Sequence, residues 1–340
     1  MGKTAVILIN LGTPDSPDPG DVHRYLIEFL TDGRVIDIPW LSRQALVRSI
    51  IVPKRYRESA KSYADIWMEA GSPLMVYGIR VCEMLQTALG NHYQVELAMR
   101  YQNPTIASVL EKVRGCEKII IVPLFPQYAS ATTGSVHQKV MELISHWTTI
   151  PEIRFISSYP TQPEMIRAFC RQSEKYTIND YDHILFSFHG LPERQIRKAD
   201  SSGCCLKKGC CERLCEKNQY CYSAQCHATA RAIAEELGIS KYSLCFQSRL
   251  GNDPWLRPYA SEVISKLAES GAKKLLVFCP AFVCDCLETI YEIGVEYRDE
   301  FINKGGETLD LVPGLNDHPE WIAGLKELVT NDRIPALTRR

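Results

Sequence analysis

The sequence has no excess of either charge and no long uninterrupted apolar run. Lys and Arg total 39 and Asp and Glu total 40, so the net charge is −1, which offers neither a basic surface for nucleic acid nor an acidic tail. The longest apolar run, residues 275–284, contains Pro280 and is about half as long as the roughly 20 residues that span a bilayer. The start of the chain lacks a small-residue cleavage site, so we expect a first β-strand there and a cytoplasmic protein.

Three motifs of common enzyme classes are also missing. No Gly-x-Gly-x-x-Gly follows an expected strand, and neither Gly-x-x-x-x-Gly-Lys-Ser/Thr nor Gly-x-Ser-x-Gly occurs. These absences argue against a nicotinamide enzyme, an NTPase and a serine hydrolase. The sequence therefore predicts a function that needs no nucleotide cofactor.

Cysteine, in contrast, is abundant. Seven of the 14 cysteines lie between Cys204 and Cys226, whereas a secreted disulfide scaffold spreads its cysteines through a short chain. Four thiolates are enough for a [2Fe–2S] cluster or for a structural zinc ion. We expect each vicinal pair to supply at most one ligand, and the lack of Cys-x-x-Cys spacing argues mildly against a zinc ribbon. The local cluster predicts a metal or iron–sulfur site, and both kinds stay open.

Short apolar runs alternate with amphipathic stretches along the chain. The expected strands are 5–10, 94–98, 118–122, 153–156, 183–188, 243–247, 274–279 and 309–312, and the expected helices are 105–114, 135–147, 163–175, 224–237, 257–269, 286–303 and 319–329. Continuously apolar strands separated by helices are typical of parallel sheets that are covered on both faces. The pattern therefore predicts an α/β protein.

The two halves of the sequence echo each other. Residues 7–14 resemble residues 184–192, and residues 118–125 resemble residues 274–282. We expect two similar Rossmann-like lobes, each a four-stranded parallel sheet flanked by helices. The lobes should cover residues 1–160 and 161–315, followed by a helix and tail over 316–340. Because ligands bind beyond the carboxyl ends of parallel strands, we expect the active-site cleft between the lobes.

One histidine and three glutamates are candidates for chemistry. His189 ends the strand 183–188 and is followed by Gly190, so its imidazole could act in the cleft as a base or as a metal ligand. A structural, hydrogen-bonded histidine fits the same position. Glu288, Glu292 and Glu296 lie four residues apart on one expected helix and form a single stripe. Such a stripe could collect a divalent cation or take up protons, although a solvated acidic face has the same pattern.

Six ordered motifs place these residues in a known context. They are Ile-Asn-Leu-Gly-Thr-Pro at 9–14, Gly-Ser-Pro-Leu at 71–74, Pro-Leu-Phe-Pro-Gln-Tyr-Ala at 123–129, Ser-Phe-His-Gly-Leu-Pro at 187–192, Gln-Ser-Arg-Leu-Gly at 247–251 and Cys-Leu-Glu-Thr at 286–289. By these motifs the sequence resembles the ferrochelatases over almost its whole length. The resemblance implies a lyase of heme biosynthesis that inserts Fe²⁺ into protoporphyrin IX, forms protoheme and releases two pyrrole protons. Coproporphyrin stays open as the substrate.

The resemblance also implies roles for individual residues. His189 corresponds to the catalytic histidine and Glu288 to its carboxylate partner. Glu292 and Glu296 continue the acidic stripe, which together with His189 and Glu288 would handle the metal or the protons. The residues expected to contact the porphyrin are Leu11, Tyr128, Ser130 and Trp255. Bending a flat macrocycle exposes its nitrogen lone pairs, at a cost of about 1–5 kcal/mol that burial of the porphyrin faces would offset.

A lip over the porphyrin pocket is expected at about residues 38–60. Apolar and basic residues alternate there, and such a lip could touch an anionic membrane on its inner face, although a simple amphipathic surface helix has the same pattern. The expected state is a monomer or a homodimer. Two rival functions are a non-catalytic heme or metal carrier and a chelatase that loads cobalt or nickel into a more polar macrocycle.

The cysteine-rich insertion at about residues 200–226 departs from the commonest bacterial form of the family. Some ferrochelatases hold a [2Fe–2S] cluster in an internal segment, and the resemblance implies such a cluster here. The expected ligands are Cys204, Cys211, Cys221 and Cys226, with Cys210 as a substitute for Cys211. Cys205 and Cys215 are weaker candidates.

Overall fold

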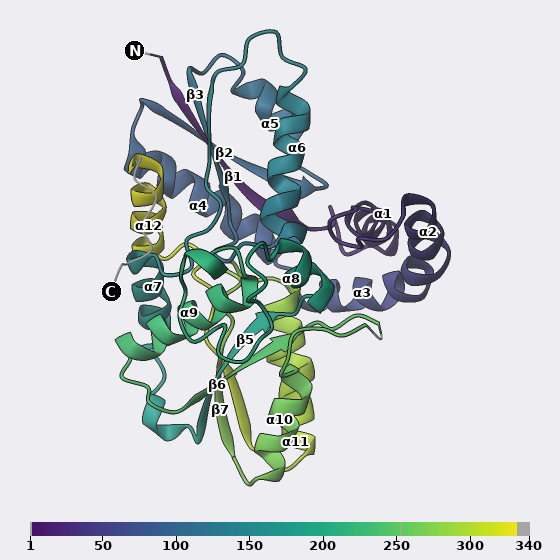
Figure 1. Ribbon diagram of the computed structural model, residues 1–340, viewed down its shortest axis with the longest axis vertical. Coiled ribbons are helices and arrows are strands. Elements are labelled where there is room, and N and C mark those ends of the chain that lie inside the picture. Colours follow the sequence, from purple (N-terminus) through teal and green to yellow (C-terminus); the bar gives the residue numbers. More distant parts are fainter. Residues whose placement is uncertain (1, 252, 332–340) are drawn as a thin grey trace. The chain divides into compact units, whose positions relative to one another are not determined.

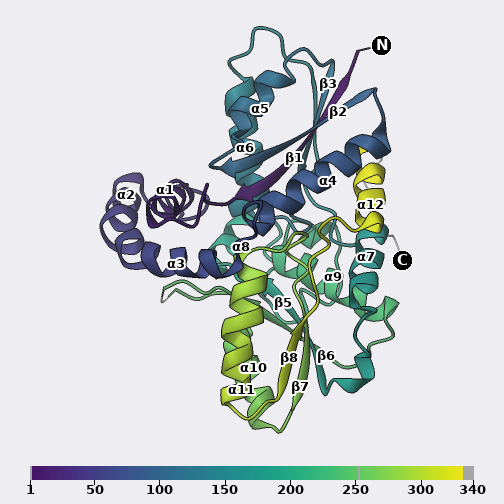
Figure 2. The same cartoon turned by 180° about the vertical axis from the view of Figure 1, so that it is seen from behind.

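A computed structural model describes residues 2–251 and 253–331 of the chain (Figure 1 and Figure 2). It divides into two compact units, one of residues up to Ser158 with Leu325–Thr330 and the other of Tyr159–Gly324. Each unit contains one four-stranded parallel sheet with helices packed against it. The expected α/β fold class is therefore confirmed, while the expected cleft stays a prediction.

The first sheet has the strand order β2-β1-β3-β4. Its strands are β1 (Thr4–Gly12), β2 (Tyr93–Tyr101), β3 (Lys118–Pro123) and β4 (Glu152–Phe155). The central strand β1 is buried on both faces because Ala5 through Ile9 are all apolar and fully covered. All pairings are parallel, so the carboxyl ends of the strands lie along one edge.

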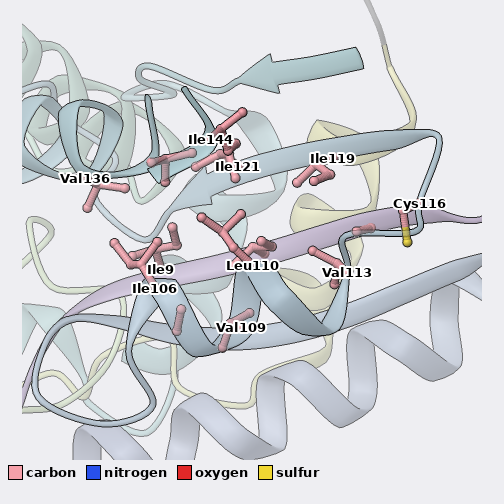
Figure 3. Close-up of a cluster of buried hydrophobic side chains, with 14 of the residues drawn as sticks. Ile9, Ile106, Val109, Leu110, Val113, Cys116, Ile119, Ile121, Val136 and Ile144 are labelled. Carbon is pink, nitrogen blue, oxygen red and sulfur yellow. The ribbon is translucent and has the colours of Figure 1, made fainter. Parts of the chain in front are cut away.

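Helices α5 (Ile106–Lys112) and α6 (Ser135–Ile144) cover one face of the first sheet. Figure 3 shows the apolar cluster that joins them to it. Ile9 and Ile121 from β1 and β3 lie among Val109 of α5 and Val136 of α6. The cluster holds the two helices against the sheet, because burial of apolar surface stabilises the fold by about 25 cal/mol per Å².

The remaining helical segments of the first unit are α1 (Pro19–Leu30), α2 (Trp40–Leu46), η1 (Val47–Ile51), α3 (Val52–Ile66), α4 (Pro73–Leu89) and η2 (Ser130–Gly134). The segments η1 and η2 are π-helical. The sequence interpretation missed α1 and α4, although α4 carries a recognisable start signal. Ser72 Oγ accepts a hydrogen bond of 3.3 Å from the Met75 backbone N–H, and Pro73 occupies the first turn, which is the usual pattern of a capped helix.

The second sheet has the strand order β6-β5-β7-β8. Its strands are β5 (His183–His189), β6 (Tyr242–Gln247), β7 (Lys274–Phe278) and β8 (Thr308–Leu311). When the four strands of each sheet are numbered in chain order, both sheets have the same order in space, which is second, first, third, fourth. The likeness between the two halves of the sequence therefore reflects one topology that occurs twice.

The helical segments of the second unit are α7 (Pro163–Ser173), η3 (Ile178–Asp180), α8 (Glu193–Ala199), η4 (Glu216–Asn218), α9 (Tyr222–Glu236), α10 (Ala260–Glu269), η5 (Leu287–Tyr297), α11 (Arg298–Asn303) and α12 (Pro319–Thr330), whose residues from Leu325 onward belong to the first unit. The expected helices correspond to α7, α9, α10, η5 with α11, and α12, whereas α8 and the short segments η3 and η4 were not predicted. The expected helix over 286–303 is present, but its first part, η5, is π-helical and only α11 is α-helical.

Candidate active site

His189 stands at the carboxyl end of β5, the central strand of the second sheet, and is half-buried. Its Nδ1 lies 2.6 Å from the carbonyl oxygen of Gly190. A carbonyl oxygen can only accept a hydrogen bond, so Nδ1 must carry the proton. A neutral His189 then has its lone pair on Nε2, which makes this nitrogen the basic atom of the ring.

Aromatic side chains surround the His189 ring. The ring centroids of Trp255 and Phe282 lie 6.5 Å and 6.4 Å from that of His189. A side chain at Gly190 would place its Cβ 2.8 Å from the Gln247 carbonyl oxygen and 3.1 Å from Cε3 of the Trp255 ring. Only glycine therefore permits this close approach. Among the described residues no acceptor lies within hydrogen-bonding distance of the buried Trp255 Nε1.

The end of β6 connects the histidine strand to the π-helix η5. Gln247 pairs with His189 in the sheet, and its backbone carbonyl accepts a hydrogen bond of 2.8 Å from the Gly190 N–H. Its side-chain Nε2 donates to the Glu288 carbonyl oxygen at 2.8 Å and to Glu292 Oε2 at 3.0 Å. His189 and the first two glutamates of the stripe are thus joined through one residue, which the sequence interpretation did not single out as functional.

The three glutamates differ in how far their side chains are exposed to solvent. Glu288 and Glu292 are half-buried, whereas Glu296 is exposed. The i→i+5 bonding of a π-helix widens each turn, and residues four apart still lie on one side of it. Burial and the nearby negative charge of the Glu288 carboxylate raise the pKa of the Cys286 thiol.

The expected porphyrin contacts of the first unit occupy two places. Leu11 is half-buried at the end of β1. Tyr128 lies just before η2, and Ser130 is its first residue. The hydroxyl oxygens of both side chains lie close to the position that a Cβ at Gly134 would occupy. Arg34 joins this group because its Nη1 donates a hydrogen bond of 2.9 Å to Ser130 Oγ.

A cavity of about 450 Å³ opens beside the end of β1. Its lining includes Thr13, Trp67, Ser72, Met75 and Asn103. Thr13 is only 4% exposed, and no partner for its Oγ1 lies among the described residues. The N-terminus of α4 also borders the cavity through Ser72 and Met75, and the positive end of the helix dipole there favours an anion.

The cysteine-rich segment brings most of its thiols together. The Cys205 thiol neighbours those of Cys204 and Cys221, and the Cys211 thiol neighbours that of Cys221, so that these neighbours influence the pKa values of Cys205 and Cys211. The sulfur atoms of Cys210 and Cys211 lie 3.5 Å apart. Ligand atoms of Asp200, Cys204 and Cys205 lie within 4.8 Å of one another. Within the described residues no other three candidate ligands gather so closely, and of the expected ligands this group contains Cys204 alone.

Two further cysteines of the segment differ from this group. Cys226 is fully buried, which raises the pKa of its thiol, and Tyr222 and Cys211 lie close enough to influence that pKa. Cys215 instead caps the short helix η4 together with Asn218. Of the expected ligands, Cys204, Cys211 and Cys221 each neighbour another thiol of the segment, and Cys226 lies near Cys211.

Comparison with known proteins decides the family. The family model for ferrochelatase matches residues 3–333. A ferrochelatase of Legionella pneumophila (strain Lens) is 43% identical over 329 residues, covering 96% of this chain and 98% of the relative. A ferrochelatase of Ectopseudomonas mendocina (strain ymp) is 44% identical over 334 residues, with the same coverage of 96% and 98%.

The chain belongs to the ferrochelatase family. It is therefore an enzyme, a porphyrin metal chelatase that inserts Fe²⁺ into protoporphyrin in heme synthesis. This confirms the family and the activity that the motifs predict. The non-catalytic carrier is thereby excluded as the main function.

A solved structure shares the fold at low sequence identity. SirB from Bacillus subtilis, determined with Fe³⁺, has a TM-score of 0.53 and 13% identity, with 96% of this chain and 94% of that chain covered. At this identity the likeness supports only the shared α/β fold and not the roles of single residues in the ferrochelatase reaction.

Proposed function

We propose that His189 is the base that accepts the pyrrole protons and that Glu288 is its carboxylate partner. The hydrogen bond from Nδ1 to the Gly190 carbonyl carries this proposal, because it leaves the lone pair of a neutral imidazole on Nε2. A free-base porphyrin must lose two N–H protons as Fe²⁺ enters, and a base held in place beside the nitrogens suits that transfer. Trp255 and Phe282 would shield the transfer from water.

The glutamate stripe would then connect the reaction to solvent. Glu288 and Glu292 are half-buried and Glu296 is exposed, so the three carboxylates offer successive acceptors along one side of η5. They could pass protons outward or bring Fe²⁺ inward, since hard oxygen ligands suit divalent cations of this kind. The Glu292 carboxylate already accepts several hydrogen bonds, so it would exchange some of them to bind a metal.

The decisive experiment measures chelation by the purified enzyme with Fe²⁺ and protoporphyrin under anaerobic conditions, followed by absorbance. His189→Ala should lower kcat by about 100-fold or more, the usual contribution of a general base, while the protein stays folded. Glu288→Gln should also lower kcat strongly. His318→Ala and Glu300→Gln are matched controls, because both residues are half-buried in the same unit and contact other groups. Near-normal turnover by His189→Ala would reject the assigned role.

We further propose that the cavity beside β1 binds a propionate arm of the porphyrin. The hydroxyl of the buried Thr13, which has no partner among the described residues, provides a hydrogen-bond donor there, and the helix dipole of α4 favours a carboxylate. Trp67 and Met75 provide apolar contact for the adjoining ring. Leu11, Tyr128 and Ser130 stay expected contacts of the macrocycle. Thr13→Val should raise KM for protoporphyrin and leave kcat nearly unchanged, and an unchanged KM would contradict this assignment.

The cysteine segment fits a [2Fe–2S] cluster by its donor set. Cys204, Cys211, Cys221 and Cys226 are our proposed ligands, with Cys210 as a substitute for Cys211. The interaction with the Cys221 thiol and burial raise the pKa of Cys211, so a bound metal would have to displace its proton. When present, such a cluster supplies one-electron redox chemistry, and the chelation proposed above uses none of it.

Iron and acid-labile sulfide in the purified protein test this proposal. Cys221→Ser should lose both, because the Cys221 thiol contacts those of Cys205 and Cys211. Cys215→Ser is the matched control and should keep both. Zinc in place of iron and sulfide would replace the cluster by a structural zinc site.

The expected lip corresponds to α2, η1 and the start of α3. Trp40 is 62% exposed and Leu41 74% exposed, whereas Val47 and Val52 are buried. We propose that the exposed side touches the inner face of an anionic membrane and that the enzyme is cytoplasmic. Among the described residues no helix is long and apolar enough to cross a bilayer. Trp40→Ser with Leu41→Ser should reduce sedimentation with anionic vesicles, and Ile302→Ser, which alters another exposed apolar residue, should not.

The oligomeric state stays a prediction of a monomer or a homodimer. Sedimentation of the purified enzyme would distinguish the two states by mass.

A further inference from the structure

We propose that Gln247 is a positioning residue, which holds the strand end of His189 at a fixed distance and angle from the π-helix η5. The inference rests on the proposed roles of His189 and Glu288. Gln247 is the last residue of β6 and is only 1% exposed. Its side chain would not touch the reacting atoms but would hold those that do.

The amide of Gln247 has a single workable orientation. Its Oε1 accepts a hydrogen bond of 2.7 Å from Ser187 Oγ, and its Nε2 donates to the Glu288 carbonyl and to Glu292 Oε2. Turning the amide over would place its oxygen against two acceptors. Ser187 lies two residues before His189 on β5, so the amide bridges the histidine strand and the π-helix.

The neighbouring Ser248 reinforces this bridge. Its backbone N–H donates to Glu292 Oε1 at 2.8 Å and its Oγ donates to Glu292 Oε2 at 2.5 Å. Ser248 has a φ of 63°, a left-handed conformation that is costly for a residue other than glycine and that persists where surrounding bonds enforce it. Tyr297 OH adds a contact of 3.4 Å to Glu292 Oε1. The Glu292 carboxylate therefore ties the end of β6 to the middle of η5.

This arrangement affects catalysis because the geometry of a π-helix is only weakly fixed by the helix itself. Wide π-turns are rare outside functional sites and depend on their surroundings. The backbone carbonyl of Glu288 itself accepts the hydrogen bond from Gln247 Nε2. This bond therefore fixes the position of the backbone from which the Glu288 side chain extends. A misplacement of about 1 Å at a reacting group can cost about 100-fold in rate. We therefore expect loss of the bridge to lower kcat more than substrate affinity.

Gln247→Glu tests the inference with little change in volume. The new carboxylate could still accept from Ser187, but it would set an oxygen against the Glu288 carbonyl and the Glu292 carboxylate. We expect kcat for Fe²⁺ insertion to fall about 10- to 100-fold, with KM for protoporphyrin unchanged. Gln162→Glu is the matched control. Gln162 is also buried in the second unit, where its Oε1 caps α7, and this variant should keep the normal kcat.

Ser187→Ala gives a second measurement in case Gln247→Glu fails to fold. It removes the bond that orients the amide, and we expect a smaller fall in kcat, again without a change in KM. A folded Gln247→Glu enzyme with normal kcat, a change confined to KM, or a Ser187→Ala enzyme with normal kcat would each overturn the inference. Failure of the proposed function is separate, because it appears as normal turnover by His189→Ala.

Discussion

Asp32 provides a sharp test of how a buried carboxylate stabilises the first unit. Its side chain is 9% exposed and lies 2.7 Å from Arg100 Nη2. The same oxygen accepts hydrogen bonds from Tyr101 OH at 2.8 Å and Ser135 Oγ at 2.5 Å, and Oδ1 accepts one of 2.7 Å from the Arg34 backbone N–H. Asp32→Asn keeps the shape of this side chain and removes its charge.

The expected loss follows from the groups left behind. Arg100, whose side chain is only 16% exposed, would lose its counter-charge. The NH₂ group of the new amide would also face hydrogen-bond donors that now point at the carboxylate. Breaking a buried ion pair from one side costs about 3–5 kcal/mol. Since this pair is not fully enclosed, we expect a fall of about 3 kcal/mol in the free energy of unfolding at neutral pH.

The pH dependence provides a second signature of Asp32. Burial alone would raise the pKa of its carboxyl group, but the hydrogen bonds from Ser135 and Arg34 and the charge of Arg100 lower the pKa below its ordinary value of 3.8. Because the pKa is lower in the folded state, the stabilisation is complete above pH 3.8 and is lost as the pH falls through the folded pKa. The difference between the native protein and Asp32→Asn should shrink over that range.

Hydrogen exchange of the β1 and β3 amides reports on the first unit, and the β5 amides provide an internal reference in the second. Protection of β1 should fall in Asp32→Asn while that of β5 is kept. Asp21→Asn is the control, because Asp21 pairs with Arg24 in a more exposed position, where an ion pair contributes at most about 1 kcal/mol. Equal effects of the two variants, or a difference that persists below the folded pKa, would refute the reasoning.

Three further outcomes are expected. Gly12→Ala should destabilise the first unit, because φ is +126° and the new Cβ would lie 2.1 Å from the Tyr101 carbonyl oxygen; an unchanged melting temperature would contradict this. Burial lowers the pKa of His183 below its ordinary 6.5, so the unfolded chain binds more protons as the pH falls below 6.5. Urea titrations of the native protein should therefore show stability falling from pH 6.5 down to the folded pKa, a slope that His183→Gln should reduce. Asp285→Asn should cost about 1–3 kcal/mol, because this buried carboxylate accepts from Asn316 Nδ2 at 2.7 Å, and calorimetry of the variant against the native enzyme would measure the loss.

Much of the fold could be predicted from the sequence. The eight strands of the described residues lie where strands were predicted, and the clearest are central strands such as β1, which is continuously apolar because it is covered on both faces. Helices with a clear amphipathic pattern, such as α7 and α10, were also recognised. The helices α1, α4 and α8 were missed, and the π-helical form of η5 was not foreseen. A π-helix differs from an α-helix in its hydrogen bonds, and an apolar pattern carries little information about that difference.

The sequence by itself determined the family and the reaction, because six motifs, two of which contain His189 and Glu288, follow one another in an order that is distinctive. Only the tertiary structure decided how they are connected. Gln247 begins one of the motifs, but the motif does not show what its side chain binds, and its bonds to Ser187, Glu288 and Glu292 join residues 41 to 60 positions apart in the chain. Likewise, spacing alone cannot rank the seven cysteines of the segment as ligands. Distances between such residues depend on how sheets and turns pack, and local sequence does not contain them.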